Sequence, residues 1–357
     1  MPFTLSRGFL LFSLVLLFVP GASAEDQGNS AAELATTGRR LEGVGKLKWT
    51  DGMCTFIGSL NACLNYVGEK TTYPYLMGVS GAAFATRFHP AWSASSADAA
   101  LDDRHASFAL AAVGYSYSWS DGGREAVVRG IDAGVPVVAA GLSRSNHWGL
   151  VTGYRFDGES FLCRRYGDES DDYSASDKVP SNALVLLRRR EAPSIVRGAR
   201  DSVARAVGFA RGDTEPKDAG YAAGFAAMDA WIEALRSRRL RSMSGKDLES
   251  TATVNAWLFN SLIDARYAAV TYLNWVATVA KGDARASCAE AASLYGQEVD
   301  VLKEARACVR YPQNVASGPK WSVETRACQA EALRNALVKE RAAVEALERA
   351  LADPDGW

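Results

Sequence analysis

The character of the chain changes near residue 190, and this change limits the folds available to it. Before Glu191, short runs rich in Val, Ala and aromatic residues alternate with helical stretches and Gly-containing turns. After Glu191, strand-like runs give way to long Ala-rich stretches with apolar residues at helical spacing. We therefore predict an α+β domain over residues 46–190, followed by an all-helical domain over residues 191–357.

The first 24 residues are predicted to be a cleavable secretory signal peptide. The positive charge of Arg7 precedes an apolar run that Pro20-Gly21 interrupts, and Ala22-Ser23-Ala24 forms a small-residue cleavage site. The apolar run is too short to span a bilayer, although an uncleaved anchor is an alternative. We expect residues 25–45 to form a flexible leader. We also expect the mature chain to begin at Glu25 and to act in the periplasm or outside the cell.

Composition argues against several classes of partner. The chain carries 40 basic and 41 acidic residues, without the basic cluster that nucleic acid or anionic lipid requires. No run beyond the signal peptide is long and apolar enough for a membrane helix, so we expect no membrane span after cleavage. The absence of CxxC and HExxH spacings gives no support to a metal site, and we expect no cofactor.

Periodicity predicts the main elements of both domains. Two helices are expected in the first domain, over residues 53–67 with Asp51 as N-cap and over residues 124–133. Four strands are expected over residues 135–140, 147–154, 160–165 and 183–187, with a turn at Asp157-Gly158. Five helices are expected in the second domain, near residues 193–210, 219–237, 247–281, 285–310 and 322–352.

Aromatic residues recur at helical spacing along the second domain. We interpret them as the core of a helical bundle, with an aromatic ligand site as the alternative. The residues concerned are Tyr221, Phe225, Trp231, Trp257, Tyr267, Tyr272 and Trp275.

Helix geometry restricts how the six cysteines pair. Cys54 and Cys63 are nine residues apart on one predicted helix, roughly 13 Å along its axis, which is too far for a disulfide. Cys308 and Cys328 instead flank a Pro- and Gly-containing loop between two antiparallel helices. We predict a disulfide between these two, while the pairing of the remaining cysteines stays open.

Cys54 is the first candidate for chemistry. It lies near the beginning of the helix predicted over residues 53–67, off its apolar stripe, and a helix N-terminus favours the thiolate over the thiol. The small Gly58, one turn further along, would leave room for a substrate. The alternatives are that Cys54 is a small buried residue or a disulfide partner.

His147 is the second candidate, because a thiol nucleophile needs a base that accepts its proton and passes it on. It opens the strand predicted directly after residues 135–140, and Asp157 and Asp168 follow as acids that could orient its ring. His89 and His105 are interpreted as surface or structural residues in a polar loop. The run Gly78-Val79-Ser80-Gly81-Ala82 approaches a serine-nucleophile motif, but it lacks the final Gly and is interpreted as a tight packed turn.

These motifs together resemble a known family over about residues 48–190. The resemblance is to papain-like cysteine peptidases of the bacteriocin-processing, double-glycine type, and more closely to the N-terminal domain family of butirosin biosynthesis protein H, an acyltransferase of related fold. It is carried by Cys54-Thr55-Phe56-Ile57-Gly58, Tyr75–Phe84, Val135-Pro136-Val137 and His147–Tyr154 with Asp157-Gly158.

The resemblance implies a Cys54 nucleophile, a His147 general base and, more loosely, Asp168 as the orienting acid. The Asp-Pro that the family carries after its second strand reads Arg165-Tyr166 here, and the oxyanion-hole Gln before the nucleophile is absent from residues 48–51. The backbone N–H of Cys54 is expected to supply one oxyanion donor.

The implied function is acyl transfer, or hydrolysis of an amide or thioester, through a thioacyl intermediate on Cys54. Its substrate would be a peptide or another acyl donor. One alternative is a catalytically degenerate papain-like module that binds a peptide or glycan. Another gives the functional role to the helical domain, as a surface for a protein partner.

Overall fold

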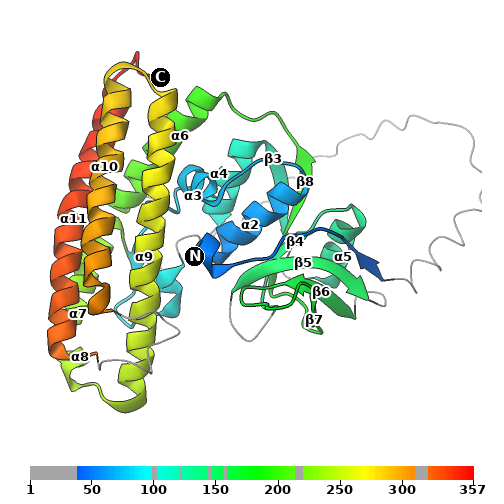
Figure 1. Cartoon of the computed structure of the whole chain (residues 1–357), viewed down its shortest axis with the longest axis horizontal. Helices are drawn as coiled ribbons and strands as arrows, with labels where there is room; N and C mark the ends of the chain where they lie inside the picture. The colour runs from blue at the N-terminus through cyan, green and yellow to red at the C-terminus, as the bar shows by residue number, and fades with distance from the viewer. Residues whose placement is uncertain are drawn as a thin grey trace, which may run out of the picture.

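The computed structural model describes residues 38–98, 103–120, 123–142, 147–155, 159–213, 220–309 and 321–357. The predicted signal peptide, most of the predicted leader and the predicted turn at Asp157-Gly158 lie outside the described residues. The described chain combines an antiparallel sheet and its helices with a bundle of long C-terminal helices (Figure 1). The mixed α/β character of the first part and the helical character of the second are therefore confirmed.

The main sheet is antiparallel and has the order β3-β8-β4-β5-β6-β7, with the short β1 also paired to β5. Its strands are β1 (Arg39–Arg40), β3 (Tyr115–Ser120), β4 (Val137–Ala140), β5 (Trp148–Arg155), β6 (Ser160–Arg164), β7 (Ser174–Ser176) and β8 (Asn182–Arg189). β4 is buried along its whole length, and its Val138 lies opposite Leu150 of β5 and Leu184 of β8. The strands predicted over 135–140, 147–154, 160–165 and 183–187 correspond to β4, β5, β6 and β8.

Four α-helices accompany the sheet: α2 (Thr55–Tyr66), α3 (Tyr73–Ser80), α4 (Asp103–Val113) and α5 (Arg124–Asp132). Short 3-10 turns occur at η1 (Trp49–Asp51) and η2 (Ala94–Ala97). α2 and α5 match the two predicted helices, but Asp51 is not the N-cap of α2, because it belongs to η1 and Cys54 occupies the cap position. His105 is not in a loop either. It is buried in α4, where its Nδ1 lies 2.9 Å from the carbonyl oxygen of Ser80.

The helical part consists of α6 (Ile195–Arg211), α7 (Gly224–Arg236), the short α8 (Arg238–Ser242), α9 (Gly245–Val279), α10 (Gly282–Glu304), the turn η5 (Ala305–Ala307) and α11 (Val323–Ala352). The five predicted helices are recovered as α6, α7, α9, α10 and α11. One short strand, β9 (Ala222–Ala223), pairs with β2 (Arg87–Phe88) and joins the two parts. No helix among the described residues is long and apolar enough to cross a membrane.

The predicted disulfide is present. Cys308 at the end of η5 bonds to Cys328 in α11, with 6.4 Å between the two Cα atoms. The other four cysteines are free and buried. This bond closes the helical hairpin of α10 and α11 at one end.

The core is shared between the two parts of the chain. Phe84, which follows α3, packs edge-on against Tyr295 of α10, with 5.7 Å between ring centroids. A Cβ at Gly78 of α3 would lie 2.0 Å from the ring of Tyr272 in α9, so this glycine lets the two helices approach closely. The domain boundary near residue 190, which was predicted from the change in residue pattern along the sequence, therefore stays a prediction.

A buried ion cluster also links the two parts. Arg266 of α9 is fully buried, and its guanidinium lies 2.5 Å from Glu340 of α11 and 3.3 Å from Glu298 of α10. The same guanidinium donates hydrogen bonds to the Ala83 carbonyl, at 2.8 Å, and to the Thr86 hydroxyl, at 2.6 Å. Burial, and then the proximity of Glu340, raise the pKa of the Glu298 carboxyl well above its ordinary value. Burial raises the pKa of the Glu340 carboxyl as well, so both carboxyl groups ionise less readily than usual beside the one guanidinium that they share.

We expect Arg266→Met to destabilise the fold by about 3–5 kcal/mol, because it removes the guanidinium that pairs with two buried carboxyl groups. The measurement is the urea midpoint of unfolding at neutral pH. Arg349→Met is the matched control, since Arg349 pairs with Glu290 at a solvent-exposed position and its loss should cost less than about 1 kcal/mol. Equal losses in the two variants would contradict a central role for Arg266.

Candidate active site

The structure brings the beginnings of α2 and β5 together. The backbone N–H of Trp148, the first residue of β5, donates a hydrogen bond to the side-chain hydroxyl of Thr55, the first residue of α2, at 3.1 Å. The ring of Phe56 also packs edge-on against Trp148. Because Cys54 and His147 immediately precede these residues, the same contacts place the two candidate side chains near each other.

Cys54 and His147 line one pocket of about 260 Å³. Its wall is completed by η2, which follows β2, and by α9 of the helical part. The lining residues are Met53, Cys54, Thr55, Ala94, Ser95, Ala97, Asp98, His147, Trp257 and Ser261. The pocket therefore lies at the boundary of the α/β and helical parts.

Cys54 is the N-cap of α2 and is only 9 % exposed. Burial, and then the negative charges of Asp98 and Asp264, raise the pKa of its thiol well above the ordinary value. The N–H groups of Ile57 and Phe56 act in the opposite direction, but neither forms a capping hydrogen bond with the sulfur. The helix N-terminus thus acts in the expected direction, but burial and the two acidic neighbours outweigh it and favour the thiol.

The backbone N–H of Cys54 already has a partner. It donates to the Tyr73 hydroxyl at 3.0 Å, and this hydroxyl donates to Oδ2 of Asp264 at 2.6 Å. The same carboxylate oxygen accepts a hydrogen bond from the backbone N–H of Met53 at 3.0 Å. The donor that was expected to serve an oxyanion is thus engaged by Tyr73.

His147 is half-buried among aromatic rings. Its ring packs edge-on against Trp49, with 5.0 Å between centroids, and lies 5.5 Å from the ring of Trp257. The Trp49 ring also packs against that of Tyr166, with 4.8 Å between centroids. Burial lowers the pKa of His147 below its ordinary 6.5, so its imidazole is neutral at neutral pH and able to accept a proton.

Asp168 lies at a turn after β6, and both of its carboxylate oxygens engage Arg165. One accepts a hydrogen bond from the Arg165 backbone N–H at 2.9 Å, and the other lies 3.4 Å from the Arg165 guanidinium. Neither of these two contacts of Asp168 involves His147. The role of Asp168 as the orienting acid therefore stays a prediction.

The space beside Gly58 is filled. A Cβ at Gly58 would lie 1.8 Å from the Tyr166 hydroxyl, so the glycine makes room for this side chain and not for a substrate. Burial raises the pKa of the Tyr166 hydroxyl, with smaller contributions from Cys54 and Asp51. Tyr166 therefore occupies the space beside Gly58, with its ring packed against Trp49.

The other candidates have structural roles. The Ser80 hydroxyl donates to the Met77 carbonyl and accepts from the Ala82 N–H. Gly78 to Ser80 form the last turn of α3 and Gly81 is its left-handed C-cap, so this run is a buried helix end where a tight packed turn was expected. His89 accepts a hydrogen bond from the backbone N–H of Ala91. No group of three or more potential metal ligands occurs among the described residues.

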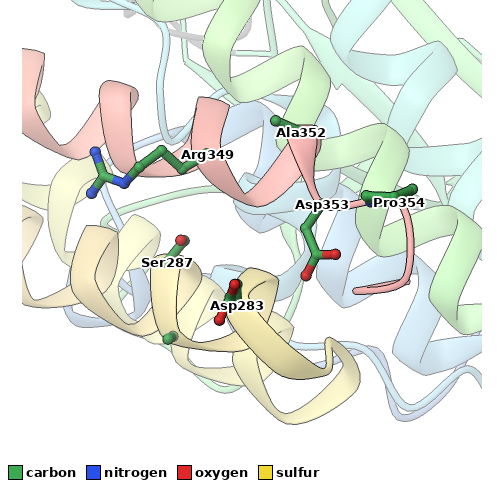
Figure 2. A pocket seen from close by; sticks show the side chains of 7 residues that line it. Asp283, Ser287, Arg349, Ala352, Asp353 and Pro354 are labelled. Atoms are coloured by element: carbon green, nitrogen blue, oxygen red, sulfur yellow. The ribbon is translucent and has the colours of Figure 1, made fainter.

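A larger pocket, of about 560 Å³, lies between the ends of α10 and α11 (Figure 2). Two of its charged residues, Arg349 and Asp353, have local partners. Arg349 is 2.7 Å from Glu290, and Asp353 accepts a hydrogen bond from the backbone N–H of Ala284. Its lining contains neither a thiol nor a histidine, so the pocket around Cys54 is the better candidate site.

Four residues of the site were not identified from the sequence: Tyr73, Asp98, Trp257 and Asp264. Tyr73 and Asp264 are 191 positions apart and meet only through tertiary packing. Trp257 was interpreted as bundle core, whereas the structure places it on the pocket wall beside His147. The spacing of Trp257, Ser261 and Asp264 was a usable signal. It places a tryptophan and two polar side chains on one face of a helix.

Comparison with models of known protein families and with curated proteins finds no match for this chain.

We expect His147 to titrate below pH 6.5, since desolvation disfavours the imidazolium. The measurement is an NMR titration of the histidine ring signals, with the His147 signal assigned by its loss in His147→Gln. Because the folded-state pKa is lowered, the contribution of this group to stability is present above the unfolded pKa and is lost as the pH falls. A midpoint above 6.5 would indicate a charged partner for the ring.

Proposed function

We propose that this chain is an exported, thiol-dependent acyl-transfer enzyme with a papain-like first domain. Its reaction would be hydrolysis of an amide or thioester, or transfer of the acyl group to another acceptor. The proposal is supported chiefly by one observation: Cys54 and His147, 93 positions apart, line the same pocket. The Cys308–Cys328 disulfide agrees with an oxidising compartment.

The protonation states favour general-base catalysis over a resting ion pair. The pKa of the Cys54 thiol is raised and that of His147 is lowered, so both groups are neutral at rest. As the Cys54 sulfur attacks the acyl carbon, His147 takes the thiol proton and then gives it to the leaving group. Water or another acceptor next attacks the thioester, His147 takes the acceptor's proton, and the thiol is regenerated.

The second candidate function is a catalytically degenerate module of the same fold that binds a peptide or glycan. The specific observation in its favour is that Tyr73 engages the Cys54 N–H, which an acyl-transfer enzyme would use for the oxyanion. A substrate carbonyl would have to displace the Tyr73 hydroxyl to reach this donor. A protein partner for the helical part also stays a prediction.

We expect an activated ester to acylate Cys54 ahead of the other free cysteines, Cys63, Cys163 and Cys288, which are fully buried. His147→Gln should slow this acylation by about 100-fold or more, because the general base is lost. The measurement is the rate of acyl incorporation into the Cys54 peptide by mass spectrometry, on mature protein with its disulfide intact.

Cys54→Ala tests the same assignment and should abolish turnover without loss of the fold, while Cys288→Ala serves as the matched control. Turnover retained in Cys54→Ala would place the chemistry elsewhere. If Cys54 reacted no faster than the buried thiols and His147→Gln had no effect, the binding module would be the better description.

A further inference from the structure

Helix α9 presents a row of residues to the site. Trp257, Ser261 and Asp264 are spaced by four and three positions, which places them on one face of the helix. Trp257 and Ser261 line the pocket that contains Cys54, and Asp264 reaches the residues immediately before α2. The helical part therefore supplies one wall of the site.

Asp264 makes the most specific of these contacts. Its Oδ2 accepts hydrogen bonds from the Met53 N–H at 3.0 Å and from the Tyr73 hydroxyl at 2.6 Å, and Tyr73 in turn accepts from the Cys54 N–H. Burial raises the pKa of the Asp264 carboxyl, and the hydrogen bonds from Tyr73 and Met53 act against this shift by favouring the carboxylate. A negative charge at this place also compensates the positive end of α2.

The position of Asp264 is fixed by its surroundings. Two residues further along α9, Arg266 is anchored to Glu340 of α11 and to the Ala83 carbonyl of the α/β part. These contacts hold α9 against the first part of the chain. Helix α9, anchored to both parts of the chain, thus holds the Asp264 carboxylate at the start of α2.

We propose that Asp264 is a positioning residue that restrains the reactivity of Cys54. Its carboxylate holds Met53 and Tyr73, keeps the Cys54 N–H engaged through Tyr73, and places a negative charge close to the sulfur. The inference rests on the proposed function in that it takes Cys54 as the reactive group. It adds that the helical part, through this side chain, influences how readily the thiol ionises, together with Asp98, which lines the same pocket from the other part of the chain.

The charge of Asp264 and its hydrogen bonds affect Cys54 in two separate ways. The charge disfavours the thiolate, because two negative groups near one another repel. The hydrogen bonds keep the Cys54 N–H from donating to an incoming carbonyl oxygen until Tyr73 moves. Asp264→Asn removes the charge but retains an oxygen that can accept from Met53 and Tyr73.

We expect Asp264→Asn to shift the pH profile of Cys54 alkylation by iodoacetamide to lower pH. A fall of one pKa unit gives about tenfold more thiolate below the pKa, and the lower nucleophilicity of the less basic thiolate leaves a net gain of about threefold in rate. The measurement is the alkylation rate of the Cys54 peptide against pH, by mass spectrometry, on the full mature chain.

Three comparisons distinguish this role from a purely structural one. Asp247→Asn, at an exposed position in the first turn of α9, should leave the profile unchanged. Tyr73→Phe keeps the carboxylate, so it should not reproduce the shift. Alkylation of the fully buried Cys63 and Cys163 should stay slow in every variant, because only general loosening of the fold would expose them.

An unchanged Cys54 profile in Asp264→Asn would overturn the proposal. So would an equal shift in Tyr73→Phe, or a parallel rise in the labelling of Cys63 and Cys163. This alkylation needs no substrate, so its outcome is separable from the acylation test of the proposed function. A shifted profile without ester acylation would retain the role of Asp264 and reject the enzyme.

Discussion

The buried guanidinium of Arg266 is the interaction on which the arrangement of the two parts depends. It contacts Glu298 and Glu340 from the bundle and the backbone of Ala83 from the α/β part. Transfer of these charges from water is costly, so the cluster is stable only while the guanidinium stays paired and hydrogen-bonded. Two carboxyl groups share one cation, and burial raises the pKa of both, which disfavours the presence of two negative charges in the cluster. The cluster therefore specifies where α9 lies, in addition to any stability that it contributes.

The placement of α9 then determines the composition of the candidate site. Asp264 and Arg266 are two residues apart on this helix, so anchoring one limits the positions open to the other. α2 and β5 supply Cys54 and His147, and α9 supplies the carboxylate and the Trp257 ring. A site assembled in this way is incomplete without the helical part. The bundle is thus a component of the pocket, and a partner surface would be a role additional to this one.

Much of the architecture follows from local patterns in the sequence. The strands β4, β5, β6 and β8 and the long helices carry regular apolar spacing, and the Cys308–Cys328 bond follows from the geometry of a helical hairpin. β3 was missed although Tyr115, Tyr117 and Trp119 alternate with serine, because its residues are only partly buried and its pattern is not apolar. The convergence of Cys54 and His147 was predicted from the order of elements and from family resemblance. The Tyr73–Asp264 contact could not be predicted from the sequence, because it depends on how α3 packs against α9.

The protonated state of Cys54 is the point at which local reasoning and tertiary structure disagree, and it has a chemical consequence. A helix N-terminus alone would favour the thiolate, whereas burial and the charges of Asp98 and Asp264 favour the thiol. Oxidation and disulfide exchange proceed through the thiolate, so a neutral thiol at 9 % exposure reacts slowly with oxidants. The same chain carries an oxidised pair at Cys308 and Cys328. In the oxidising compartment that we propose, a nucleophile that ionises only as His147 takes its proton would escape the oxidation that the paired cysteines have undergone.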